Sequence, residues 1–166
     1  MRKIMLNGQW ELAEAGNDRL CEVQVPGSVL SGLYGAGKIE DPFYRTNEDA
    51  TRELFWKDYE FCRTFAVTED VLNEKKVILV CEGLDTLADI YINGKKAGST
   101  DNMHRIWKYD VKSILRKGEN QLRIIFRSPL KYIAEAYKKY GNIGNDDTFE
   151  GFMHLRKAHY MFGWDW

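Results

Sequence analysis

The residues with the clearest chemical meaning are the last five, Phe162-Gly163-Trp164-Asp165-Trp166. Two tryptophans flank one carboxylate, a combination typical of sugar recognition. Indole faces cover the C–H surfaces of a sugar, and carboxylate oxygens accept hydrogen bonds from its hydroxyl groups. A frayed aromatic tail, or core residues separated from their partners, would give the same residues. Because little could pack against two terminal tryptophans, we expect the chain to be a fragment of a longer one.

A catalytic pair of carboxylates is not recognisable in the sequence. Glycoside hydrolysis needs two carboxyl groups, about 5–5.5 Å apart in retaining enzymes and about 6.5–9.5 Å apart in inverting ones. The flanks of Glu48-Asp49 and Asp146-Asp147 are typical of caps, turns or solvated faces. We therefore predict that this chain contains no catalytic residues.

Other reactive residue types are isolated. The glycine-rich stretch 31–37 lacks the Lys-Ser/Thr of a phosphate-binding loop, so we interpret it as turns. Ser28, Ser31 and Ser99 have no neighbouring base or nucleophile elbow. His154 and His159 are five residues apart, which does not place both on one helix face. We expect no nucleotide site, no metal and no cofactor.

Composition and charge describe an ordinary globular chain. Its 166 residues include 44% apolar and 30% charged ones, with a net charge of −1 and no basic stripe, so neither nucleic acid nor a membrane is favoured as a partner. Three cysteines in apolar surroundings, Cys21, Cys62 and Cys81, are expected to be free and buried. Without a visible leader or an apolar run of about 18 residues, a cytoplasmic location is the expectation.

Apolar and polar residues alternate in several short segments, the pattern of half-buried strands. Tyr59, Phe61, Phe65 and Val67 share one face of such a segment, although Arg63 interrupts that face. The expected strands are about Gln9–Ala13, Cys21–Val25, Tyr59–Val67, Lys76–Glu82, Leu87–Ile92, Arg105–Tyr109 and Gln121–Arg127. The continuous apolar run 77–81 suits a strand covered on both faces. Together these patterns predict an all-β, layered antiparallel sandwich.

Turn and cap residues complete this outline. Asn93-Gly94 predicts a tight hairpin, since a type I′ turn needs positive φ at both central positions. Ser128 as N-cap, Pro129 as first helical residue and Gly141 after the end predict one helix. A second short helix is expected at about Glu48–Phe55, and we find no internal repeat or linker. One domain spanning residues 1–166 is therefore the prediction, with short helical excursions.

Further aromatic residues have a structural and a functional interpretation. Trp10, Phe55, Trp56 and Trp107 could form a platform for a sugar ring. In a sandwich, such residues more often belong to the core. We therefore expect core positions for these four.

Taken together, the motifs resemble the amino-terminal domain of the β-mannosidases of glycoside hydrolase family 2. They occur in the expected order: Leu6-Asn7-Gly8-Gln9-Trp10, Val25-Pro26-Gly27-Ser28-Val29, Ile39-Glu40-Asp41-Pro42-Phe43-Tyr44 with Asn47-Glu48, Gly83-Leu84-Asp85-Thr86, Ile90-Tyr91-Ile92-Asn93-Gly94, and Arg156-Lys157 leading to Phe162-Gly163-Trp164-Asp165-Trp166. The final motif favours a β-mannosidase over galactosidase and glucuronidase relatives.

The resemblance implies a jelly-roll β-sandwich of the galactose-binding-like type, followed in the full enzyme by immunoglobulin-like domains and a TIM barrel. Both catalytic glutamates of such enzymes sit on the barrel, at the face where barrel active sites form. The same resemblance implies that Trp164, Asp165 and Trp166 lie on a loop that reaches the sugar pocket. The family pattern continues with Gly-Pro after this motif, where the present sequence ends.

The expected function is therefore that of a non-catalytic domain of a retaining exo-β-mannosidase, which would supply scaffold and one wall of the sugar site. Three alternatives remain open at this stage. One is another family 2 activity, such as β-galactosidase or β-glucuronidase. A free-standing carbohydrate-binding module and a purely structural interaction domain are the others, because a fold does not fix a function.

Overall fold

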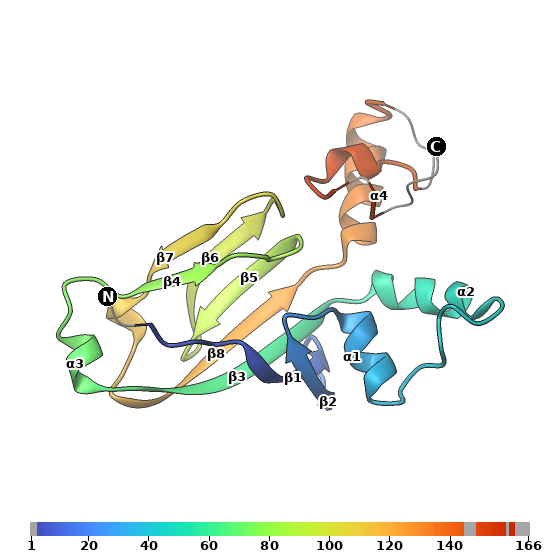
Figure 1. The fold of residues 1–166 in the computed structure, drawn as a ribbon. Coiled ribbons are helices and arrows are strands. Elements are labelled where there is room, and N and C mark those ends of the chain that lie inside the picture. Colours follow the sequence, from blue (N-terminus) through green and yellow to red (C-terminus); the bar gives the residue numbers. More distant parts are fainter. Residues whose placement is uncertain (1–2, 145–148, 159, 162–166) are drawn as a thin grey trace.

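In a computed structural model, which describes residues 3–144, 149–158 and 160–161, antiparallel strands form two layers (Figure 1). The larger sheet has six strands in the order β2-β1-β3-β8-β5-β6, and β4 pairs with β7 in the smaller one. The strands are β1 (Gly8–Glu14), β2 (Arg19–Val25), β3 (Tyr59–Val67), β4 (Ile78–Cys81), β5 (Leu87–Ile92), β6 (Lys95–Asp101), β7 (Trp107–Asp110) and β8 (Gly118–Phe126). The predicted antiparallel sandwich is confirmed.

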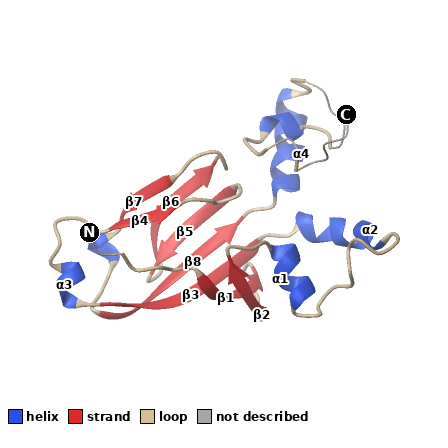
Figure 2. Cartoon of the chain, in the orientation of Figure 1, coloured by secondary structure: helices blue, strands red, loops and turns tan. Residues whose placement is uncertain are grey.

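Helices lie towards the two ends of the larger sheet (Figure 2). They are α1 (Val29–Gly35), α2 (Asn47–Arg52), α3 (Glu69–Leu72) and α4 (Pro129–Tyr140), with 3₁₀ turns η1 (Glu53–Trp56), η2 (Lys112–Ile114) and η3 (Phe152–His154). The predicted short helix near 48–55 is confirmed as α2 and η1. Among the described residues, no helix is long and apolar enough to cross a membrane.

The larger sheet has an apolar inner face, as the period-two pattern predicts. On β3, Tyr59, Phe61 and Val67 are buried while alternate residues face outward. Arg63 interrupts that face for a structural reason: its guanidinium donates hydrogen bonds to the carbonyl oxygens of Leu6 (3.0 Å) and Asn7 (2.6 Å). The arginine therefore secures the segment that leads into β1.

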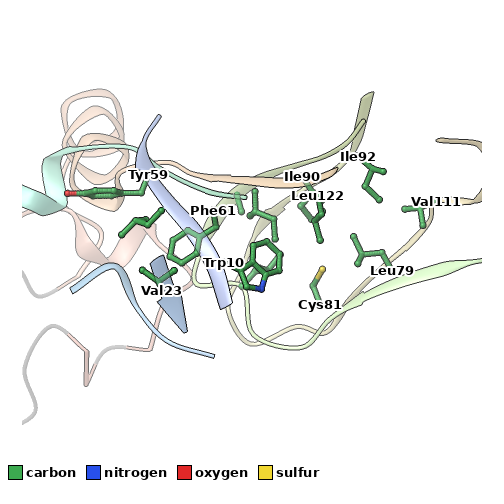
Figure 3. Packing of buried hydrophobic residues seen from close by; sticks show 14 of the residues in the cluster. Trp10, Val23, Tyr59, Phe61, Leu79, Cys81, Ile90, Ile92, Val111 and Leu122 are labelled. Atoms are coloured by element: carbon green, nitrogen blue, oxygen red, sulfur yellow. The ribbon is translucent and has the colours of Figure 1, made fainter. Parts of the chain in front are cut away.

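The core fills the space between the two layers (Figure 3). Ile90, Ile92 and Leu122 of the larger sheet face Leu79 and Cys81 of β4. Burial of this continuous apolar cluster is the main stabilising contribution that the sandwich offers.

The prediction that the run 77–81 is covered on both faces is wrong. Ile78 and Val80 are 43% and 44% exposed, because they lie on the outer face of the two-stranded sheet. Only Leu79 and Cys81 point into the core. A continuous apolar run thus marks β4 without telling how many of its faces are covered.

Strand β6 was not predicted as a strand, although the hairpin before it was. Asn93 and Gly94 have φ of 51° and 77°, and they join β5 to β6 as the type I′ pattern requires. Inside the sandwich, a Cβ on Gly98 would lie 2.1 Å from a ring carbon of Tyr109. The position that would carry an apolar side chain in an ordinary strand is therefore glycine.

Two asparagines fix the base of this hairpin. Asn120 is fully buried, and its amide donates to the carbonyl oxygens of Arg116 (2.7 Å) and Gly118 (2.9 Å). Its side-chain oxygen accepts hydrogen bonds from Asn93 Nδ2 (2.8 Å) and from the Arg116 amide (2.9 Å). Asn93 Nδ2 also donates to the Ile114 carbonyl (2.9 Å). All four hydrogen-bonding positions of the Asn120 side chain are used, which makes its burial tolerable.

The prediction that the stretch 31–37 consists of turns is wrong for most of its length, because α1 occupies residues 31–35. Ser28 caps this helix, and Ser28 and Ser31 bond to each other's backbone amides in a capping box. A Cβ on Gly32 would lie 2.3 Å from a methyl carbon of Val23, so glycine lets the helix lie close against β2. Gly32, one of the glycines that suggested turns, therefore allows close packing of a helix.

Helix α4 begins and ends where its capping residues predict. The Ser128 hydroxyl accepts a hydrogen bond from the Lys131 amide (3.1 Å), and Gly141 follows the last residue with φ of 73°. Leu130 and Ile133 are buried, whereas Tyr140 is exposed. Ser128 Oγ also donates to the Phe55 carbonyl (2.6 Å), which ties α4 to η1. We call the described residues of 29–56 and 129–161 the helical end.

Candidate functional site

The predicted sugar-contacting residues Trp164, Asp165 and Trp166 lie outside the described residues, as does His159. The structure does describe the segment that leads to them, residues 149–158 and 160–161, and the surface that supports it. This support is the candidate functional site, because it holds the described residues that precede the aromatic motif in the sequence.

An ion pair links the segment to the sandwich. Lys157 Nζ donates to Asp85 Oδ2, although the two residues are 72 positions apart in the sequence. The Thr86 hydroxyl donates to the other carboxylate oxygen, Oδ1. The Lys157 side chain is only 15% exposed and that of Asp85 28%. Both oxygens of a largely shielded carboxylate are therefore held by this chain's own donors.

Backbone contacts surround this ion pair. Arg156 forms a parallel bridge with Asn102, and its carbonyl accepts a hydrogen bond from the Met103 amide (3.0 Å). The Ala158 amide contacts the Met103 sulfur at 2.9 Å. Residues 156, 157 and 158 are thus each attached to the loops that flank β5 and β6.

A second apolar cluster lies beneath the segment, between α4 and the start of β5. Its buried members are Leu87, Leu130, Ile133, Phe152 and Leu155. Gly151 is needed for this packing: its φ is 79°, and a Cβ there would lie 2.7 Å from the Ile133 carbonyl oxygen. The segment is therefore seated on α4 by hydrophobic burial as well as on the sheet by polar contacts.

Another motif of the resemblance forms a folded loop at the helical end. Asp41 Oδ1 accepts a hydrogen bond from the Phe43 amide (2.9 Å), and Asn47 Nδ2 donates to the Asp41 carbonyl (2.8 Å). The loop presents the Phe43 ring, 94% exposed, beside the exposed Tyr44. Asp41 and Asn47 are consequently residues that build a turn.

The four aromatic residues expected in the core divide into two groups. Trp10 is buried, and its indole N–H donates to the Leu6 carbonyl (2.8 Å). Trp107 is half-buried and stacks on Tyr109. For Phe55 and Trp56 the prediction is wrong, because both are exposed on η1, which lies outside the two sheets.

Histidines and cysteines have structural surroundings. His154 Nε2 lies 2.9 Å from the Gly141 carbonyl oxygen, at the end of α4. In the described ranges, no three His, Cys, Asp or Glu side chains gather as metal ligands would.

The three cysteines are free, as predicted, although only Cys81 is buried, while Cys21 and Cys62 are partly exposed. Burial raises the pKa of the Cys81 thiol to about 11, and burial followed by the hydrogen bond to Glu60 raises the pKa of Cys62 to about 12. Both thiols therefore stay protonated and unreactive at neutral pH.

The Asp85–Lys157 pair was missed by sequence reasoning. Both residues belong to motifs that carry the resemblance, but neither periodicity nor spacing can pair side chains so far apart in the chain. Membership of two such motifs was the only available signal.

An antiparallel sandwich with helices at its ends, and a terminal segment seated on it, defines a galactose-binding-like domain. Residues 10–166 match the family "Glycosyl hydrolase 2 galactose-binding domain-like", and the chain belongs to this family.

Individual relatives agree with this assignment. The chain is 32% identical over 174 residues to a probable β-mannosidase of Caenorhabditis elegans, a match covering 98% of this chain and 19% of the relative. A β-D-mannosidase crystal structure from Dictyoglomus thermophilum superposes on all of this chain and 20% of its own, with a TM-score of 0.94 and 36% identity. A β-glucuronidase of Bifidobacterium dentium matches 74% of this chain and 19% of its own, with a TM-score of 0.55 and 25% identity. The chain thus spans about a fifth of the length of the relatives it matches.

Proposed function

We propose that this chain is the non-catalytic amino-terminal domain of a retaining exo-β-mannosidase. One observation carries the proposal: sequence and fold agree with β-mannosidases along the entire chain, with a TM-score of 0.94 to the Dictyoglomus thermophilum enzyme. The relatives are about five times as long, which supports further domains in the complete protein. In that protein the substrate would be a terminal β-linked mannoside.

The chain's own contribution would be scaffold and one wall of the sugar site. Asp165 would accept hydrogen bonds from two hydroxyl groups of the terminal sugar, while Trp164 and Trp166 cover its apolar surface. Two glutamates outside this chain would act as nucleophile and as acid/base in the double displacement. The attachment of residues 155–158 to the sandwich supports this role, because these residues precede the motif by only a few positions in the sequence.

Replacing Asp165 in the complete protein tests the sugar contact. Hydrogen bonds to a charged group in a dry pocket are worth about 1.5–3 kcal/mol each. A net loss equivalent to about one such bond lowers kcat/KM for an aryl β-mannoside roughly tenfold to several-hundredfold, which is the effect expected of Asp165→Ala, with folding little changed. Asp165→Asn should give an intermediate value. Asp18→Ala, which removes an exposed carboxylate from the β1–β2 turn, is the matched control and should have no effect. Wild-type kcat/KM in a folded Asp165→Ala protein would contradict the contact.

The isolated chain should hydrolyse no glycoside, because it contributes neither carboxyl group of the double displacement. Purified chain incubated with an activated aryl β-mannoside is expected to give the background rate. Turnover that persists through repurification would contradict the assignment as a non-catalytic domain.

A second candidate is another family 2 activity, favoured by the likeness to the Bifidobacterium dentium β-glucuronidase. Its TM-score of 0.55, against 0.94 for the β-D-mannosidase, makes it the weaker candidate. A panel of aryl glycosides on the complete protein decides between them. We expect turnover of the β-mannoside and little turnover of the β-galactoside or β-glucuronide.

A further inference from the structure

We infer that the Asp85–Lys157 ion pair is a positioning device: it fixes the direction in which the segment carrying the aromatic motif leaves the sandwich, and so places Asp165 against the sugar. This inference rests on the proposed function. It assigns a role in the reaction to two residues that would not touch the substrate.

The first step is that Lys157 is the last strongly held side chain before the motif in the described residues. It lies five positions before Phe162 and eight before Asp165. Beyond it, the Ala158 amide contacts Met103, and the Met161 amide bonds to the Ala158 carbonyl (3.0 Å). An extended chain covers at most about 3.3–3.6 Å per residue. The ion pair is therefore close enough to restrict where the motif can reach.

The second step concerns direction. The apolar cluster that includes Leu155 and Phe152 attracts the segment to α4, but hydrophobic burial has little directional preference. A charge-assisted hydrogen bond, by contrast, is short and directional. The ammonium of Lys157 meets a carboxylate whose other oxygen is already held by Thr86. Lys157 therefore holds the one oxygen of this carboxylate that Thr86 does not, which ties its ammonium to a defined point beside the start of β5.

The third step is that stability alone is a poor explanation for a shielded ion pair. Removing two charges from water costs much of what their attraction returns, whereas the best-attested use of such pairs is to fix register. Here the pair sits between two backbone attachments, at Arg156 and Ala158, so it fixes register at the point where the segment meets the loops that flank β5 and β6. The cations of other ion pairs in the described sandwich are more exposed than Lys157, at 38% for Arg123 and 69% for Lys117.

The test uses the complete protein and an aryl β-mannoside. Lys157→Met keeps the length of the side chain and removes the charge. Because misplacement by about 1 Å can cost a hundredfold, we expect kcat/KM to fall about tenfold to a hundredfold. Lys157→Arg should recover most of the activity. Lys96→Met, which breaks the ion pair of Lys96 with Asp89 (2.7 Å) on the outer face of the sheet, is the matched control and should leave kcat/KM unchanged.

A double-variant cycle separates positioning from general destabilisation. If Lys157 acts through Asp165, then Lys157→Met should reduce kcat/KM much less in an Asp165→Ala background than in the wild type. A purely structural role predicts the same fold-loss in both backgrounds. Should Lys157→Met fail to fold, Asp85→Asn keeps the shape of the carboxylate and is tested in the same cycle.

The outcomes are distinguishable. An Asp165→Ala effect without a Lys157→Met effect, or with equal Lys157→Met losses in both backgrounds, overturns the positioning role and leaves the sugar contact intact. No effect of Asp165→Ala overturns the sugar contact itself, and with it the positioning role, while the glycoside panel still tests the β-mannosidase assignment. A large Asp165→Ala effect, rescue by Lys157→Arg and non-additive losses together support both.

Discussion

The sandwich and the helical end are built in different ways. The strands bury one continuous cluster between two layers, and Ile90 and Leu122 are almost fully inaccessible there. At the helical end, a smaller apolar cluster, caps and single polar contacts hold short elements, such as Ser128 with the Phe55 carbonyl. The exposed Phe, Tyr and Trp rings of the described part of the chain all belong to the helical end: Tyr34, Phe43, Tyr44, Phe55, Trp56, Tyr132, Tyr140 and Tyr160. The sandwich thus supplies rigidity, and the helical end supplies surface.

A matched pair of core substitutions tests this division and should give the largest effects. Ile90→Ala removes a fully buried side chain from the main cluster, so we expect a loss of about 2–5 kcal/mol in the free energy of unfolding. Ile133→Ala removes the same atoms from the smaller cluster beneath α4, which can relax more easily, and should cost less. Urea denaturation measures both. Equal losses would show that the two clusters behave as one cooperative core.

Loss of the α4 cap should have the next largest effect. Ser128→Ala removes the acceptor for the Lys131 amide and the donor to the Phe55 carbonyl, and we expect a loss of about 1–2 kcal/mol. Hydrogen exchange should accelerate in α4 before it does in the strands, because the change is confined to the helical end. Ser113→Ala, at an exposed serine of η2, is the control. Uniform acceleration across β3 and β8 would contradict a separate helical end.

Substituting two glycines allows a turn of the sandwich to be compared with a helix of the helical end. Gly94 has φ of 77°, so Gly94→Ala should destabilise the protein by about 1 kcal/mol or more. Gly35 lies in α1 with nothing within 4 Å of an added Cβ, and Gly35→Ala should stabilise by a few tenths to about 1 kcal/mol. Thermal denaturation of the two variants should shift in opposite directions. An increase in the denaturation temperature for Gly94→Ala as well would mean that the hairpin tolerates another turn type.

Alkaline pH should weaken the sandwich specifically. Burial raises the pKa of Cys81 to about 11, from an ordinary value of 9.0. The unfolded thiol ionises first, so this contribution to stability is complete below about pH 9 and is lost as the pH rises towards 11. Cys81→Ala should have a shallower decline in that window. An unchanged pH profile would show that Cys81 becomes solvated before unfolding.

The smallest effect is expected for Tyr59→Phe. The Tyr59 hydroxyl is buried without a hydrogen-bond partner among the residues that the structure describes. Removing it eliminates a desolvated polar group and leaves the ring in place, so the free energy of unfolding should be unchanged or rise by up to about 1 kcal/mol. A loss above 1 kcal/mol would point to a water-mediated contact at that hydroxyl.

Local patterns were sufficient to predict most of the sandwich. β3 alternates with period two apart from Arg63. Leu122, Ile124 and Phe126 share one face of β8, and the Asn93-Gly94 turn carries its own conformational signal. Strand β6 was not predicted, because Gly98 stands where a strand would ordinarily carry an apolar side chain, and the close Tyr109 ring leaves no room for one. For α1, the capping box at Ser28 and Ser31 was the signal that outweighs the glycines.

The candidate site was less predictable, for physical reasons. Trp164, Asp165 and Trp166 remain predictions, since they lie outside the described residues. The described segment that precedes them in the sequence is attached through contacts between distant parts of the chain, as Lys157 meets Asp85 across 72 positions. Composition and periodicity describe only neighbours in the sequence, so they could not reveal that attachment.

The Asn93–Gly94 hairpin also bears on how this protein would age in solution. In an Asn-Gly pair the glycine has no side chain to hinder its backbone nitrogen, which attacks the asparagine amide carbon and expels ammonia, and water then opens the cyclic imide to give a carboxylate. At Asn93 that conversion would replace a donor by an acceptor-only oxygen, facing the Ile114 carbonyl and Asn120 Oδ1. The hydrogen bonds that hold the Asn93 amide should also slow the attack of the Gly94 nitrogen on it. Loss of the amide on storage should therefore be faster in the unfolded chain than in the folded one. A mass increase of about 1 Da at this pair, followed with and without urea, is the measurable sign of that protection.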